Sequence, residues 1–431
     1  MEPRLTGSLI ADVELLLVFS ILLCFFVFLV VRRPLVGFVS FIFLVLTRLH
    51  QYIPNSEVFR PSVGVGIIMM LGLFLFLWKT KAPIFFTGPQ TFILCAFIAF
   101  SWISLFTKGQ TLYDAYGHLL IEQLLLVFVS FFATINAVRS MRDLQIVIKT
   151  LVGIGLTISL MTLVQSFVTG NFFGLGRSWS YQRVDAAVIR AGSLGIEPNG
   201  VAATLAVLLP LFCYFLYDGK RSVFINGLYY VGVLLVVLTI FLTYSRTGFV
   251  CLTAACFLIF GKKLSIKNII VFLSLLLMVV IVIPGAFWER IASTGTTDTT
   301  GTGRLLIYQT ALRMIQAHPL TGVGYGQFHY FYGHYGGHLD STSPHNTYLS
   351  IAAESGVINL SIFICLILAT FVDLRRLRGK ALHVSDPGMV QLVDALSASL
   401  IVALVAGLTL DCSSWVPFYI CLALVVALKR I

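Results

Sequence analysis

The stretch VFINGLYYVGVLLVVLTIFLTYSRTGFVCLTAACFLIF, residues 223–260, decides the fold class. It is apolar over almost its whole length, and Arg246 is its single charged residue. As one helix, its 38 residues would extend roughly 57 Å, about twice the thickness of a ~30 Å hydrocarbon core. The chain therefore has to turn near Arg246, which predicts two membrane helices with a charge at the turn.

The rest of the chain has the same character. Of its 431 residues 58% are hydrophobic and 11% are charged, and the mean hydropathy is +0.96, unlike soluble domains. We expect an all-α polytopic membrane protein of about 12–13 transmembrane helices, with residues 1–431 forming a single integral membrane domain. The first segment reads as a retained helix, not a signal peptide, because no small-residue cleavage site follows it. The expected segments are residues 8–31, 35–49, 62–78, 91–106, 119–138, 147–168, 201–217, 223–244, 248–260, 269–287, 346–371, 390–410 and 415–428.

Lysine and arginine are concentrated in alternate connections between these segments. The positive-inside rule places such connections in the cytoplasm, so orientation and anionic lipid explain the net charge of +11 better than nucleic acid does. The remaining connections face outward, and two are long: a first outer loop, residues 169–198, and a periplasmic loop, residues 286–344. The second contains RLLIYQTALRMIQ, whose apolar spacing predicts an amphipathic helix on the outer membrane surface. The basic connections are residues 79–81, 139–142, 220–221, 262–267 and 375–380, with Lys429 and Arg430 at the end.

Two patterns that could indicate other protein classes have simpler explanations. The eight cysteines all lie in or beside apolar runs, which is typical of small core residues rather than of disulfides or zinc ligands. The alternating glycines of GVGYGQ, residues 322–327, follow no predicted strand and precede no acidic partner. They indicate a turn that lets loop backbone pack closely, rather than a nucleotide site.

Three polar residues near the outward-facing ends of the expected membrane helices require an explanation. A charge at the membrane boundary is costly, so Arg246 is functional by default, although snorkelling is the alternative. Arg190 closes the first outer loop just before a membrane helix, where a solvated loop residue is the alternative. His345 follows Ser343 and Pro344, which we expect to be the N-cap and first residue of a helix. The helix dipole there disfavours imidazolium, and a neutral imidazole can accept a proton or merely cap the helix.

Together these residues predict an anion pocket. Two guanidiniums and a helix N-terminus suit a phosphorylated or pyrophosphorylated ligand. The chain contains no D-x-D pair, so we expect no metal, and the arginines would supply the positive charge. The histidine-rich stretch FHYFYGHYGGHLD matches no zinc pattern, and its tyrosines offer flat faces for stacking on sugar rings.

Four segments in order carry a resemblance. RAGSLGIEPNGVAATLAVLLP, YSRTGF, GTGRLLIYQTALRMIQAHPLTGVGYGQF and PHNTYLSIAAESGVI, within residues 190–358, resemble the shared segments of the bacterial O-antigen ligase and polymerase family. The resemblance implies a GT-C-like, multi-pass glycosyltransferase of the bacterial cytoplasmic (inner) membrane, acting in lipopolysaccharide or exopolysaccharide assembly. Such enzymes move a glycan from undecaprenyl diphosphate to an acceptor hydroxyl at the periplasmic face, without metal or other cofactor.

Site roles follow from the resemblance as expectations. Arg190 and Arg246 would bind the pyrophosphate of the carrier, and His345 would be catalytic, activating the acceptor hydroxyl. The candidates for glycan or acceptor contacts are Asn199, Arg304, Tyr332, Tyr335 and Asn346. The implied partners are an undecaprenyl-diphosphate-linked oligosaccharide, an acceptor glycan or glycolipid and the lipid bilayer, with no nucleic acid. Whether a chain-length regulator also binds stays open.

The signature usual for ligases is only partly present. It has His, then Asn, Ser or Gln, nine residues, Gly, two residues and two threonines. His345, Asn346 and Gly356 obey it, whereas Asn359 and Leu360 replace the threonines. Ligase, repeat-unit polymerase and transferase of another surface glycan therefore remain open. A membrane permease or lipid-linked sugar transporter is the alternative from another class, but no interrupted helix pair or paired intramembrane acids support it. A purely structural scaffold would leave the boundary arginines and His345 unexplained.

Overall fold

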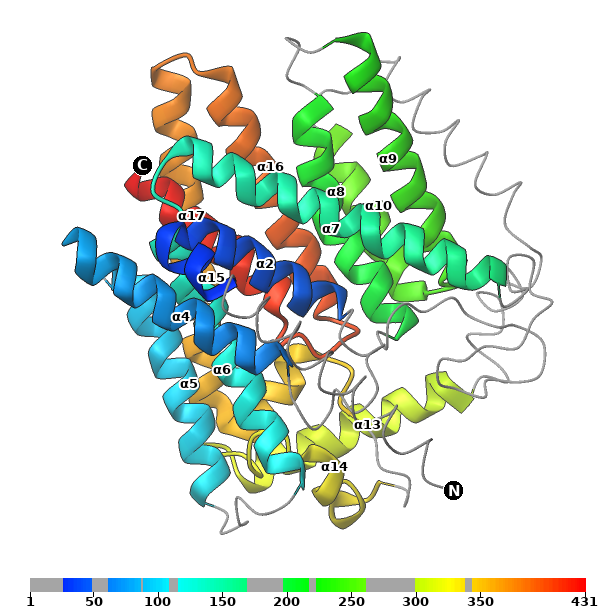
Figure 1. Ribbon diagram of the computed structural model, residues 1–431. Coiled ribbons are helices and arrows are strands. Elements are labelled where there is room, and N and C mark those ends of the chain that lie inside the picture. The colour runs from blue at the N-terminus through cyan, green and yellow to red at the C-terminus, as the bar shows by residue number, and fades with distance from the viewer. Residues whose placement is uncertain are drawn as a thin grey trace, which may run out of the picture.

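The protein is all-helical in the part that the structure describes. A computed structural model describes residues 26–48, 61–86, 88–107, 115–168, 197–216, 222–260, 299–337 and 343–431, and these contain helices and turns but no strand. The expected all-α class is therefore confirmed (Figure 1). The helices are α2 (Pro34–Thr47), α4 (Pro61–Thr80), α5 (Pro89–Thr107), α6 (Ala115–Ala137), α7 (Met141–Val168), α8 (Pro198–Leu216), α9 (Val223–Leu242), α10 (Arg246–Phe260), α13 (Thr299–Ala317), α14 (Phe328–Phe331), the 3₁₀-helix η5 (Gly333–Tyr335), α15 (Thr347–His383), α16 (Pro387–Ala406) and α17 (Val416–Arg430).

The membrane character is confirmed. Within the described residues seven helices, α4, α5, α7, α8, α9, α15 and α16, are long and apolar enough to cross a membrane. Eleven of the thirteen expected segments coincide with helices, while residues 269–287 and most of residues 8–31 lie outside the described part. The turn predicted in the opening stretch is present, because α9 ends at Leu242 and α10 begins at Arg246. The helix predicted in the long loop is α13.

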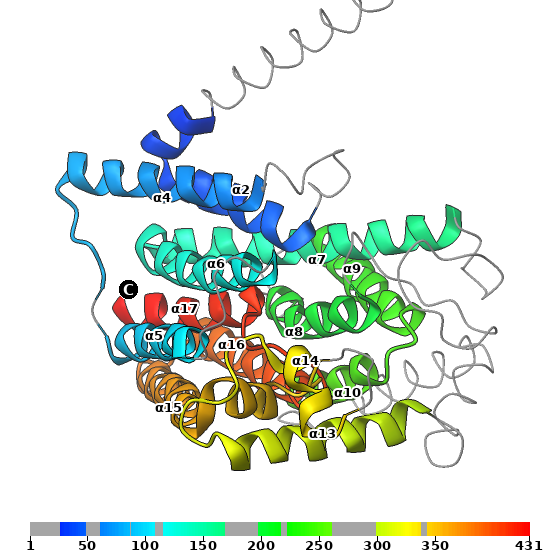
Figure 2. The same ribbon diagram turned by 90° about the horizontal axis from the view of Figure 1, so that it is seen from below.

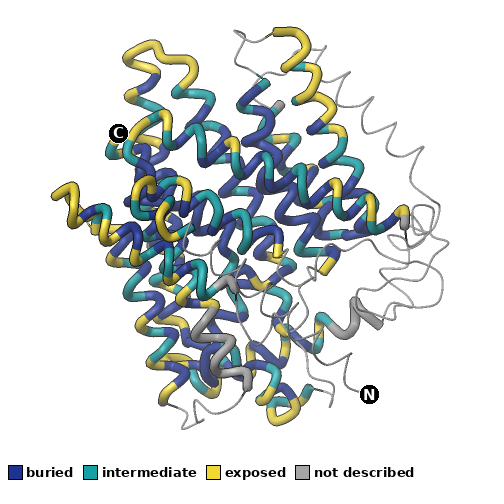
Figure 3. The backbone as a smooth tube through the Cα atoms, in the orientation of Figure 1, coloured by how far each residue is buried: buried dark blue, intermediate teal, exposed yellow. Residues whose placement is uncertain are grey.

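The centre of the bundle is formed by α8 and α17, which are buried along most of their length (Figure 3). α8 packs against α7, α9, α10 and α16, and α17 packs against α6, α15 and α16. α2 and α4 lie on one side, and α13 runs along the opposite edge, where it packs against α15 (Figure 2). The seven cysteines in the described residues are free thiols, in line with their interpretation as packing residues.

α5 and α15 run antiparallel, and polar contacts at both ends fix their register. Near the middle, the rings of Phe97 and Phe363 lie 5.6 Å apart. Asn359 donates to Ser101 Oγ at 2.9 Å, so the asparagine that replaces a signature threonine is a packing residue here. Further along, Ser104 Oγ lies 2.6 Å from the carbonyl oxygen of Glu354. These contacts align the N-terminal part of α15 with the C-terminal part of α5.

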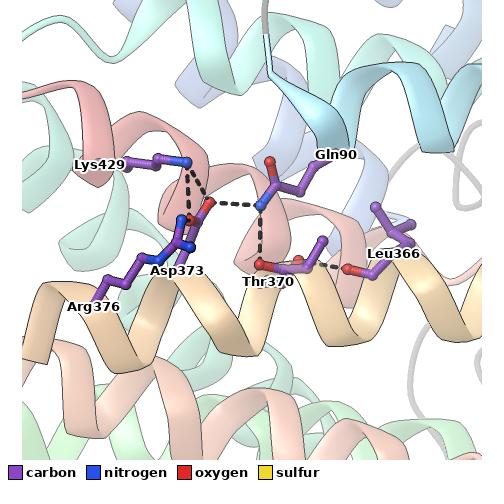
Figure 4. Close-up of polar contacts among 7 residues, drawn as sticks. Gln90, Leu366, Thr370, Asp373, Arg376 and Lys429 are labelled. Carbon is purple, nitrogen blue, oxygen red and sulfur yellow. Dashed lines mark hydrogen bonds and ion pairs between the residues drawn. The ribbon is translucent and has the colours of Figure 1, made fainter.

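A charged cluster closes the other end of this helix pair (Figure 4). Asp373 of α15, with only 4% of its side chain exposed, accepts from Gln90 Nε2 at 2.7 Å and from Lys429 Nζ at 2.9 Å. Gln90 also donates to the carbonyl oxygen of Ala369 at 3.2 Å. Arg376 lies 4.0 Å from Asp373, but 71% of its side chain is exposed. The buried carboxylate therefore ties α5, α15 and α17 together, and Arg376 is peripheral to it.

Replacement of Asp373 should destabilise the bundle. Asp373→Ala removes the carboxylate that accepts from the Gln90 amide and from the Lys429 ammonium, a loss of roughly 1–3 kcal/mol for buried hydrogen-bonded groups. We expect a clearly lower melting temperature in detergent. Arg376→Ala is the matched control, with an expected effect under about 0.5 kcal/mol because an exposed ion pair contributes little. Equal melting temperatures for the two variants would contradict the assignment of Asp373 as the tie.

Candidate functional site

The candidate site lies where three helices begin: α8 at Pro198, α10 at Arg246 and α15 at Thr347. The connection between α16 and α17, residues 407–415, contacts two of these starts. The N-terminus of a helix carries partial positive charge and free N–H groups, so several starts together favour an anion. The side chains at each start decide what this arrangement can do.

The starts of α8 and α10 are joined by Ser245. Its hydroxyl donates to Asn199 Oδ1 at 2.7 Å and accepts from the N–H of Gly248 at 3.0 Å, so it caps α10 while contacting the first turn of α8. Gly248 allows a close approach, because a Cβ there would overlap the Cβ of Ala202. Arg246, which follows Ser245, is therefore held beside the first turn of α8.

The starts of α10 and α15 meet at residues 408 and 409. The hydroxyls of Thr247 and Thr409 are 2.8 Å apart, and the side-chain amide of Asn346 donates to the carbonyl oxygen of Leu408 at 3.1 Å. Arg246 and His345 each precede one of these bonding residues in the chain. The structure thus brings Arg246 and His345, 99 positions apart in the sequence, to the same end of the bundle.

The start of α15 corrects one prediction. Ser343 was expected to be the N-cap and Pro344 the first helical residue, but the N-cap is Asn346, whose Oδ1 accepts from the N–H groups of Tyr348 and Leu349 at 3.0 Å each. His345 has a left-handed backbone (φ 46°), which cannot continue a right-handed helix. The helix therefore starts two residues after His345.

Thr347 locks this start to the α16–α17 connection. Its N–H donates to the carbonyl oxygen of Gly407 at 2.8 Å, and its hydroxyl donates to that of Leu410 at 2.9 Å. The same hydroxyl accepts from the N–H of Cys412 at 2.8 Å. One buried threonine thus fixes the connection on both sides of Asp411, and with it the position of His345.

His345 is half-buried, and three charged groups act on it. Burial lowers the pKa of its imidazole and Arg304 acts in the same direction, whereas Glu197 and Asp411 raise the pKa. Nδ1 lies 3.4 Å from Ser343 Oγ. In the tautomer in which Nδ1–H donates to Ser343, Nε2 is unprotonated and can accept a proton.

The other sequence-predicted site residues have diverse positions. Arg190 lies outside the described residues. Arg304 of α13 is half-buried within electrostatic range of His345.

The ring of Tyr332 is 4% exposed and packs 5.8 Å from that of Phe328, while Tyr335 is half-buried and lies edge-on to His318. Asn199 and Asn346 use their amides to join helices, so both shape the site from within.

Two acidic residues near the site were missed in the sequence. Glu354 is 5% exposed, and its carboxylate accepts from the N–H groups of Gly326 at 3.0 Å and Phe328 at 3.2 Å. It therefore anchors the glycine-rich turn to α15. Asp411 accepts from Ser350 Oγ at 2.6 Å. Two signals in the sequence could have drawn attention to these acids. Glu354 is a carboxylate inside an apolar helix, and Asp411 is the only acid in the connection between two apolar helices.

The prediction for the GVGYGQ turn is confirmed. Gly322 has φ 67° and Gly356, at a kink in α15, has φ 84°. A Cβ on Gly322 would overlap the backbone of Glu354, and one on Gly356 would overlap that of Leu320. The N–H groups of Val323 and Gly324 also donate to the carbonyl oxygens of Ala353 and Glu354 at 2.9 Å. The turn thus packs backbone to backbone on α15, about two helical turns after the start of that helix.

No metal centre emerges from the described side chains, since none of their His, Cys, Asp and Glu residues form a group of three that could hold an ion. His329 and His334 lie within the described residues, and His338 and Asp340 lie outside them.

Comparison with known proteins finds a family match over part of the chain. Residues 231–364 match the family model described as O-antigen ligase. The match runs from α9 to the first half of α15 and includes three of the four resembling segments, so it supports the resemblance to the O-antigen ligase family that those segments carry. No curated protein matches the chain.

We expect the glycines of this loop region to tolerate alanine only where the added Cβ has space. Gly322→Ala forces a side chain into a left-handed backbone and against Glu354, which costs at least about 1–2 kcal/mol. We expect a lower melting temperature and less folded protein on purification. Gly333→Ala is the control, because its Cβ meets nothing within 4 Å. If both variants melt like the unsubstituted protein, the close packing of the turn on α15 is not a stabilising feature.

Proposed function

We propose that the protein transfers a glycan from undecaprenyl diphosphate to an acceptor hydroxyl at the periplasmic face of the bacterial cytoplasmic membrane, without metal. The observation that carries this proposal is the pair of contacts, Thr247 with Thr409 and Asn346 with Leu408, that join the residues next to Arg246 and His345. A guanidinium and a neutral imidazole at the same end of the bundle suit a pyrophosphate leaving group and an attacking hydroxyl. The match to the O-antigen ligases favours glycan transfer over the alternative of a permease or lipid-linked sugar transporter.

The donor pyrophosphate would bind at the helix starts. Arg246 supplies a guanidinium suited to bidentate contacts with phosphate oxygens, and the partial positive charge of α10 and α15 adds to it. Arg304 is a further cation at this site, and we propose Arg190 as another from its place in the family segment. Charge on the pyrophosphate grows as it departs, so these cations stabilise the transition state more than the bound donor.

The acceptor would be activated by His345. The hydroxyl oxygen of the acceptor attacks the anomeric carbon while the bond from that carbon to the phosphate oxygen breaks. The electron pair of that bond leaves with the undecaprenyl diphosphate, and the hydroxyl proton moves to Nε2 of His345. We also propose that the half-buried ring of Tyr335, the last residue of η5, contacts the sugar.

The proposed orientation rests on the two ends of α15. His345 precedes its first residue, whereas Arg375, Arg376 and Lys380 are exposed near its last turns. Residues 357–375 alone extend roughly 28 Å at 1.5 Å per residue, nearly the thickness of the hydrocarbon core. The positive-inside rule assigns the arginine-rich end to the cytoplasm, which puts His345 on the periplasmic side.

The two central residues should be necessary for transfer. In an assay with a defined lipid-linked oligosaccharide and acceptor, Arg246→Ala should lower kcat by about 10²- to 10³-fold through lost charge stabilisation. His345→Ala should lower it by about 10²- to 10⁴-fold through loss of the base. Arg375→Ala, at the far end of α15, is the control and should keep full activity. Full activity of Arg246→Ala or His345→Ala would rule out this mechanism, and movement of the donor across proteoliposomes without product would instead favour a transporter.

Transfer should not depend on divalent metal, because arginines occupy the role that Mg²⁺ has in many pyrophosphate sites. Rates measured with excess chelator and with added Mg²⁺ or Mn²⁺ should agree. Loss of activity in chelator that a metal restores would refute the metal-independent part of the proposal.

A further inference from the structure

Asp411 is fixed on the first turns of α15 by both its side chain and its backbone. Its Oδ2 accepts from Ser350 Oγ at 2.6 Å, and its Oδ1 accepts from the N–H of Ser413 at 3.0 Å. The residues on either side of it, Leu410 and Cys412, both bond to the hydroxyl of Thr347. Its carboxylate therefore has a defined place near the helix start that His345 precedes.

We propose that Asp411 is a positioning residue for His345: its fixed carboxylate holds the α16–α17 connection against the start of α15 and supplies the negative charge that offsets Arg304. The inference rests on the proposed role of His345 as the base. It assigns a task to a residue outside the matched family segment, which ends at residue 364.

The charges around His345 come from three different elements. Arg304 is on α13, Glu197 lies just before α8, and Asp411 lies between α16 and α17. Burial and Arg304 lower the pKa of His345, while Glu197 and Asp411 raise it. Without an anion the imidazole would remain neutral but become a weaker base, and its proton affinity in the transition state would fall. The two acids thus oppose the loss of basicity that the burial and the cation impose.

Glu197 has the larger effect on the pKa of His345, but Asp411 is the more firmly held of the two acids. Glu197 is exposed at the start of α8, whereas the two oxygens of Asp411 are held by hydrogen bonds to Ser350 and Ser413. Asp411 also lies within electrostatic range of Glu354 on α15 and of the buried Tyr325. The Ser350 hydroxyl donates to Asp411 and lies 3.4 Å from Glu354 Oε2, so it separates the two carboxyl groups.

A purely structural role is the rival explanation, because Asp411 also closes a turn with Ser413. Asn at this position can keep that turn, and its amide can donate to Ser350, so Asp411→Asn removes the charge while preserving the shape. A structural residue would then leave the titration of His345 unchanged. A residue that acts through charge would shift it.

The experiment measures the titration of His345 directly. The full-length protein in detergent is treated with diethyl pyrocarbonate, which modifies neutral imidazole, over a range of pH, and the modification rate at His345 is read by peptide mass spectrometry. In Asp411→Asn the midpoint should move to lower pH, because an anion that favours imidazolium is gone. In Arg304→Gln it should move to higher pH, and Asp411→Glu should restore the original midpoint. His383, exposed at the far end of α15, is the internal reference and should not shift.

The pH profile of transfer separates this inference from the proposed function. The acid limb of kcat should follow the midpoints measured at His345 in the same three variants. An unchanged midpoint in Asp411→Asn, in protein that melts normally, would overturn the role of Asp411 even if transfer requires His345. A shifted midpoint in a protein that transfers no glycan would support the charge coupling and refute the proposed function instead.

Discussion

The hydrogen bonds that Thr347 makes to residues 407, 410 and 412 are the constraint on which the candidate site depends. Groups buried between membrane helices cannot rely on water, so each donor and acceptor at a helix start needs a protein partner. Thr347 supplies three such contacts, and Asn346 satisfies the first N–H groups of α15 while bonding Leu408. The position of His345 follows from these bonds rather than from contacts of its own ring.

The two ends of α15 have contrasting chemistry. At one end Asp373 is neutralised by Lys429 and hydrogen-bonded by Gln90, which makes a closed, structural cluster. At the other end Arg246, Arg304 and His345 lie where three helices begin, with Glu197 and Asp411 near His345. A closed cluster of paired charges favours stability, whereas arginines beside several helix N-termini favour an anionic ligand. α15 thus has a structural charge cluster at one end and the candidate functional site at the other.

The sequence predicted the helices and their turn at Arg246 because a chain with few charges shows its boundaries plainly. It also singled out Arg246 and His345, since polar residues are exceptions in such a chain. It misplaced the start of α15, because local capping rules favour Ser343 whereas distant contacts with residues 407–412 favour Asn346. Asp411 escaped attention for the same reason: its partner Ser350 lies 61 positions away, and local patterns carry no trace of that contact. The sequence alone did not indicate that Tyr332 would be buried.

The central claim is that an acceptor hydroxyl, deprotonated by His345, displaces a pyrophosphate held by Arg246 in a single step. The most direct test is the anomeric configuration of the new glycosidic bond, read by NMR on the product of a donor of known configuration. A single displacement predicts inversion at the anomeric carbon. Retention would require a covalent glycosyl intermediate on the protein and would contradict the account.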